Sequence, residues 1–119
     1  MKSVWTLQID RDVQENVLVL ALRGRLGSAS TGALLAGIPP EGEYRAVLID
    51  LEGVDYMSGA GLIALDAAAQ RILEAGARLA LSGACDPVRL VLEFGGLLSG
   101  VPIEPSRAAA LERLRLDRT

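Results

Sequence analysis

The segment from Ala46 to Leu62 contains the residues of this chain whose types and spacing could support chemistry. Its apolar run, 46–51, is typical of a buried strand, and a polar turn leads from there to Ser58. Three small residues and an amphipathic pattern follow Ser58, which predicts the start of a helix. Backbone N–H groups are free at such a start, so the junction favours negative charge.

The sequence provides no general base that could activate Ser58 as a nucleophile. The chain has no histidine, and its only lysine is Lys2, so neither a Ser-His nor a credible Ser-Lys pair is available. The carboxylates Asp50, Asp55 and Asp66 are interpreted as capping or solvated groups. A single cysteine, Cys85, can form neither an internal disulfide nor a metal cluster. We therefore expect no catalysis, no metal and no cofactor.

Gly59, Gly61 and Ala64 also match the G-x-G-x-x-A form of the dinucleotide-binding fingerprint. A dinucleotide-binding domain is thus an alternative interpretation. Two features disfavour it. The fingerprint should follow its strand directly, yet residues 52–58 intervene, and the next expected strand ends in Leu81-Ser82-Gly83 without the ribose-binding acid.

Chain length and net charge exclude several other classes of protein. A chain of 119 residues, half of them hydrophobic, is expected to form one domain over 1–119. A formal charge of −3 argues against a nucleic-acid or anionic-membrane surface, which requires clustered Lys and Arg. No signal peptide and no apolar run of membrane-spanning length is visible, so we expect a cytoplasmic protein without direct membrane insertion.

Hydrophobic periodicity and turn residues predict nine elements in the order β-β-α-β-α-β-α-β-α. The expected strands are 5–9, 17–22, 45–51, 78–81 and 101–104, with a polar turn at 10–16. A short helix runs through Leu34, a second from the Ser58 junction to Gly76, a third begins with Asp86 as N-cap, and Ser106 caps the last. This alternation predicts an α/β fold, with a mixed sheet of about five strands, about four helices and an antiparallel first hairpin.

The order of elements and several motifs resemble the STAS domains of bacterial anti-sigma-factor antagonists. The motifs are Gly24-Arg25-Leu26, the segment 50–62, the segment 75–81, Asp86-Pro87-Val88 and the segment 94–97. The resemblance covers roughly residues 7–114. It implies a non-enzymatic STAS domain that binds an anti-sigma factor with a serine-kinase fold. In that family, phosphorylation of a serine at the start of the helix after the third strand abolishes binding.

Three polar positions of the family surface are changed in this chain. Aligned on Gly61-Leu62, the phospho-acceptor position is Gly59, the preceding aspartate is Ser58, and an aspartate of the facing loop is Gly27. Either Ser58 replaces the acceptor one residue early, or the site is not phosphorylated. We favour the second interpretation, because an N-cap serine already points at its own helix backbone.

The predicted contact surface therefore combines the loop after the second strand with the helix start. Its residues are Gly24, Leu26, Gly27, Ser28, Met57, Ser58, Gly59 and Ala60. Gly61 is expected to pack closely on the neighbouring strand. The resemblance leaves open a scaffold or subunit role in a transport or stress-signalling complex, and also a homodimer.

Overall fold

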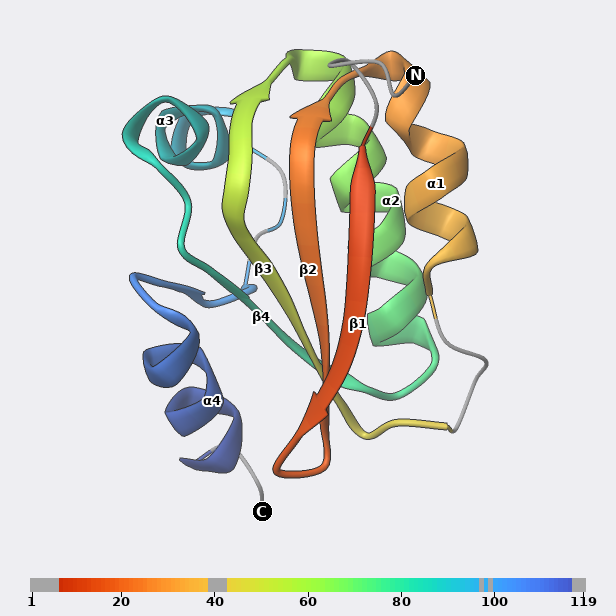
Figure 1. The fold of residues 1–119 in the computed structure, drawn as a ribbon, viewed down its shortest axis with the longest axis vertical. Coiled ribbons are helices and arrows are strands. Elements are labelled where there is room, and N and C mark those ends of the chain that lie inside the picture. The colour runs from red at the N-terminus through yellow and green to blue at the C-terminus, as the bar shows by residue number, and fades with distance from the viewer. Residues whose placement is uncertain (1–6, 39–42, 97, 99, 117–119) are drawn as a thin grey trace.

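The polypeptide forms a five-stranded mixed sheet with helices on both faces (Figure 1). The computed structural model describes residues 7–38, 43–96, 98 and 100–116. The strands are β1 (Gln8–Gln14), β2 (Val17–Leu26), β3 (Ala46–Met57), β4 (Arg78–Ser82) and β5 (Ile103–Glu104). The helices are α1 (Thr31–Ala36), α2 (Gly59–Glu74), α3 (Asp86–Phe94) and α4 (Arg107–Leu116), with a 3₁₀ turn at Ser28–Ser30. The predicted α/β class and element order are confirmed.

The strands lie in the order β1-β2-β3-β4-β5. β1 pairs with β2 in an antiparallel hairpin, as predicted, and the other pairs are parallel. The carboxyl ends of β2 and β3 therefore meet at one edge of the sheet, at the top of Figure 1. Helix α2 begins at this same edge, directly after β3.

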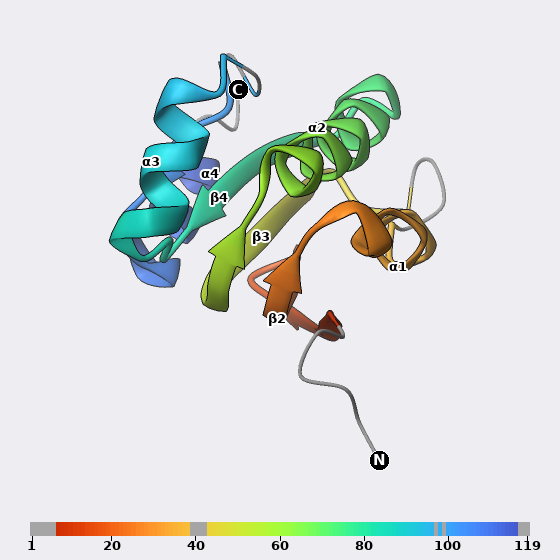
Figure 2. The same cartoon turned by 90° about the horizontal axis from the view of Figure 1, so that it is seen from above.

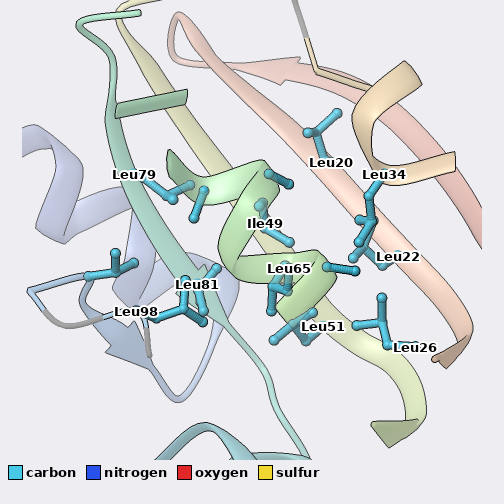
Figure 3. Packing of buried hydrophobic residues seen from close by; sticks show 14 of the residues in the cluster. Leu20, Leu22, Leu26, Leu34, Ile49, Leu51, Leu65, Leu79, Leu81 and Leu98 are labelled. Atoms are coloured by element: carbon cyan, nitrogen blue, oxygen red, sulfur yellow. The ribbon is translucent and has the colours of Figure 1, made fainter. Parts of the chain in front are cut away.

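The larger part of the core lies between the sheet and α2, with α1 beside it (Figure 2). Alternate residues of the strands point to this face, since side chains alternate along a strand. Figure 3 shows the packing around the buried Leu65 of α2. The labelled strand residues in this layer are Leu20, Leu22, Leu26, Ile49, Leu51, Leu79 and Leu81. The core is aliphatic, as expected of a chain with so few aromatic residues.

Helix α4 covers the opposite face of the sheet. Its buried Ala110 and Leu114 pack against a small cluster that includes Val19 and Leu48. At the start of α4, Nε and Nη2 of Arg107 lie 3.0 and 2.7 Å from Oδ2 of Asp50. Oδ1 of the same carboxylate accepts a hydrogen bond of 2.9 Å from the Glu52 amide. Asp50 thus anchors α4 to the sheet, away from the α2 face.

Three strands extend well beyond their predicted ends, and β5 covers only Ile103–Glu104 of the predicted 101–104. β1 continues through the predicted polar turn 10–16, and the chain reverses only at Glu15 and Asn16, which have φ values of 53° and 67°. An edge strand with exposed charged residues has little hydrophobic alternation, which explains the error. β2 and β3 also extend beyond their predicted ends, to Leu26 and Met57. Residues 1–6 lie outside the described residues, so the prediction of a strand at 5–9 is observed only from Gln8 onward.

The structure contradicts one predicted N-cap residue and confirms another. The predicted N-cap Asp86 is instead the first residue of α3, after Cys85. Its carboxylate contacts Arg89 at 2.8 Å rather than capping the helix. Ser106 is confirmed as a cap, because its Oγ accepts a hydrogen bond of 3.1 Å from the Ala109 amide.

Candidate docking site

The junction between β3 and α2 is organised by Ser58. Its Oγ accepts a hydrogen bond of 3.0 Å from the Gly61 amide, so the predicted N-cap role is confirmed. The Ser58 amide donates to the Leu26 carbonyl at 3.0 Å and thereby joins α2 to the end of β2. A serine cap of this kind contributes about 1 kcal/mol to stability. The hydroxyl that the sequence offers as a phosphate acceptor is therefore engaged in holding its own helix.

The loop that faces this junction is fixed by Ser30, which is buried. Ser30 Oγ accepts from the Gly27 amide at 3.0 Å and donates to the Arg25 carbonyl at 3.1 Å. A Cβ atom built on Gly27 would lie 3.7 Å from Ser58 Oγ. Residues 24–30, which form the end of β2 and the turn after it, and the start of α2 therefore form one continuous surface, which we call the docking face.

The two glycines of the α2 start have opposite surroundings. A Cβ on Gly61 would lie 2.1 Å from the Leu26 carbonyl oxygen, so this glycine allows α2 to pack closely on β2, as expected. A Cβ on Gly59 would meet no atom within 4 Å. Gly59 is exposed and is not required by packing, which leaves the first turn of α2 open at the surface.

The predicted contact residues come together, but not all of them are accessible. Ser28, Gly59 and Ala60 are exposed, whereas Gly24, Gly27 and Ser58 are partly exposed. The side chains of Leu26 and Met57 belong to the core, with only 0% and 4% of their surface exposed. The sequence analysis placed both residues on the contact surface, but in the free chain their side chains are not accessible to a partner. Both strands run further than expected, and their last apolar residues turn inward.

Sequence reasoning missed an apolar groove beside the docking face, between α2 and α3. Its lining residues are Gly59, Leu62, Ile63, Val91, Phe94 and Gly95. Ile63 and Phe94 are 64% and 82% exposed, although both are large and hydrophobic. The available signal was Ile63, an apolar residue that falls outside the stripe formed by Leu62, Leu65 and Ile72.

Little reactive chemistry is available at this face. The described residues hold no group of three or more His, Cys, Asp or Glu that could bind a metal ion. Of the carboxylates considered above, Asp50 lies beneath α4, and Asp66 accepts from the Leu98 amide at 3.3 Å. Asp55 is exposed on β3. The arrangement offers a surface to contact rather than a set of acid, base and nucleophile.

The dinucleotide interpretation needs one correction. Because β3 reaches Met57, Gly59 follows its strand almost directly, and the predicted spacing objection is wrong. The second objection still holds, because β4 ends at Ser82 without an acidic residue. In addition, the Leu26 carbonyl fills the space beside Gly61 where a pyrophosphate would approach a fingerprint glycine.

Comparison with known proteins identifies the class to which this fold and site belong. The sequence matches the STAS domain over residues 8–110, and the chain belongs to this family. A curated relative, a candidate anti-sigma factor antagonist named BtrV from Bordetella bronchiseptica, is 35% identical over 107 residues, covering 87% of this chain and 91% of the relative. The chain is thus a STAS domain of the anti-sigma-factor-antagonist type.

Solved structures confirm the fold. An anti-sigma factor antagonist from Mycobacterium paratuberculosis superposes with a TM-score of 0.72 at 20% identity, covering 97% of this chain and 99% of that one. A sulfate transporter family protein from Wolinella succinogenes gives 0.73 at 20% identity, covering 88% and 89%. At these identities the likeness concerns the fold alone. In the part of the chain that the structure describes, no helix is both long and apolar enough to cross a membrane.

Proposed function

We propose that this STAS domain is a non-enzymatic cytoplasmic regulator that binds an anti-sigma factor with a serine-kinase fold through its docking face. The observation that carries the proposal is the open start of α2. Gly59 presents bare, accessible backbone beside the partly exposed Gly27 of the facing loop. A glycine that packing does not require, at a position exposed on a helix start, permits close approach by another macromolecule.

We further propose that binding is not switched off by phosphorylation at the family position. Gly59 has no hydroxyl group, and Ser58 Oγ is already hydrogen bonded to the Gly61 amide. To receive a phosphate, the Ser58 hydroxyl would have to leave this cap and enter the active site of a kinase, at a cost of about 1 kcal/mol. Binding would then be constitutive, with its extent set by the amounts of the two proteins.

A second candidate role is a subunit of a transport or stress-signalling assembly. The fold likeness to the sulfate transporter family protein favours it. However, that likeness is at 20% identity, whereas the relative at 35% identity bears the name of an antagonist. We therefore place the regulatory role first.

The partner and its kinase activity can be tested together. The tagged chain is purified from its native cell, the co-purifying protein is identified, and the purified pair is incubated with ATP and Mg²⁺. We expect an anti-sigma factor with a kinase fold, and an unchanged intact mass of the STAS chain. An antagonist with serine at the family acceptor position is the positive control. A gain of one phosphate at Ser58 would refute constitutive binding, and recovery of a membrane complex alone would favour the second role.

A further inference from the structure

The groove between α2 and α3 concentrates exposed apolar surface that the protein's own packing does not use. Among the described residues, Phe94 and Ile63 are the two most exposed large hydrophobic side chains, and both line this groove. Leu90, one turn before Phe94 on α3, is also half exposed. Large exposed apolar side chains that gather at one place mark interaction surfaces more often than isolated ones do.

The groove is built into the contact between the two helices. Leu62 forms its floor and is 3% exposed. Helix α3 ends at Phe94 and is followed by its C-cap, Gly95. A Cβ on Gly95 would lie 2.0 Å from Cδ2 of Leu62. Because Gly95 has no side chain, α3 can pack closely against Leu62 of α2. Ile63 and Phe94 form the two sides of the groove.

The charge distribution restricts what the groove accepts. None of its six lining residues is charged. On α3, Arg89 pairs with Asp86 at 2.8 Å and with Glu93 at 3.9 Å, so this helix carries no excess of positive charge. With a net charge of −3, the chain is also poorly suited to an anionic lipid surface. These properties favour an apolar protein segment over a phosphorylated ligand or a membrane.

From these features we infer that the groove receives the apolar face of an amphipathic helix of the protein partner, an inference that rests on the proposed function. The lining residues are spaced by three or four positions on both α2 and α3, which matches a row of side chains from a third helix. Six residues fall well short of the roughly 800 Å² per partner that a stable interface needs, which disfavours a second copy held here alone. Gly59 belongs both to the groove and to the docking face, so one partner would cover the two together.

The test uses the full chain and the purified anti-sigma factor. Phe94→Ser and Ile63→Ser should each weaken binding by about tenfold or more, because exposed apolar anchors dominate interface energies. Both side chains point outward, so thermal melting should stay close to that of the parent. Val13→Ser is the matched control and should bind as the parent does. This half-exposed apolar residue pairs with Leu18 at the amino end of β2, whereas the docking face lies at the carboxyl end of β2.

A photo-crosslinking residue at position 94 identifies the occupant. Crosslinks to a helix of the partner whose apolar residues repeat every three or four positions would support the inference. Crosslinks to a strand or loop, or between two copies of this chain, would overturn it. If Phe94→Ser binds normally while Gly59→Glu does not, the inference fails and the proposed function stands. If both variants bind normally, docking at the start of α2 is refuted as well.

Discussion

Gly59→Glu is expected to abolish binding of the partner while leaving the protein folded. A Cβ at this position meets nothing within 4 Å, so the new side chain fits the free protein. A carboxylate in the first turn of a helix also interacts favourably with the helix dipole, and any residue other than proline suits a helix better than glycine does. In the complex, the same carboxylate would be buried without a partner charge. We expect affinity to fall at least roughly 100-fold, because an unpaired charge in an interface costs several kcal/mol.

Titration calorimetry with the purified anti-sigma factor measures this loss. Val13→Glu is the control, because it adds the same charge at a half-exposed position that pairs with the amino end of β2, away from the docking face at the carboxyl end. The control should bind within about twofold of the parent, since exposed charges beyond a Debye length of about 8–10 Å are largely screened. Equal affinity of Gly59→Glu and the parent would place the docking face elsewhere.

Gly61→Ala should destabilise the fold strongly, although it adds only one methyl group. That methyl group would lie 2.1 Å from the carbonyl oxygen and 2.5 Å from the carbonyl carbon of Leu26, so backbone must move. Overpacking of this kind costs roughly 1–3 kcal/mol, and the upper part of that range applies where backbone must move. The free energy of unfolding, measured by urea denaturation, should fall by that amount, with an unchanged m-value if unfolding remains two-state.

Gly59→Ala provides the matched comparison, two residues earlier in the same helix. It removes the flexibility of a glycine without creating a clash, so it should be neutral or should stabilise by up to about 1 kcal/mol. Equal stabilities of the two alanine variants would contradict the close approach of α2 to β2.

The sequence contains enough information to predict the architecture of this protein. Apolar runs such as 17–22 and 46–51 lie on buried strands. Between such strands along the chain are helical stripes such as that of Leu62 and Leu65. Ser58 and Ser106 are both caps because a hydroxyl before a helix satisfies free backbone amides. These features depend on residues close together in the chain.

Features that depend on contacts between residues far apart in the sequence could not be predicted from local patterns. The burial of Leu26 and Met57 follows from the parallel pairing of β2 with β3, which extends to the very ends of both strands. The groove depends on how α3 settles against α2 at Gly95 and Leu62. Local periodicity cannot report such a contact, because its two sides lie more than thirty residues apart in the sequence.

Amide hydrogen exchange of the chain, free and bound to the purified anti-sigma factor, tests the docking face most directly. The first amides of a helix have no intrahelical partner, so Gly59 and Ala60 are sensitive reporters of a covering surface. We expect slowed exchange at residues 24–30 and 59–63, and unchanged exchange at the β1–β2 hairpin. Protection confined to α4 or to the β1 edge, with none at Gly59 and Ala60, would contradict docking at the start of α2.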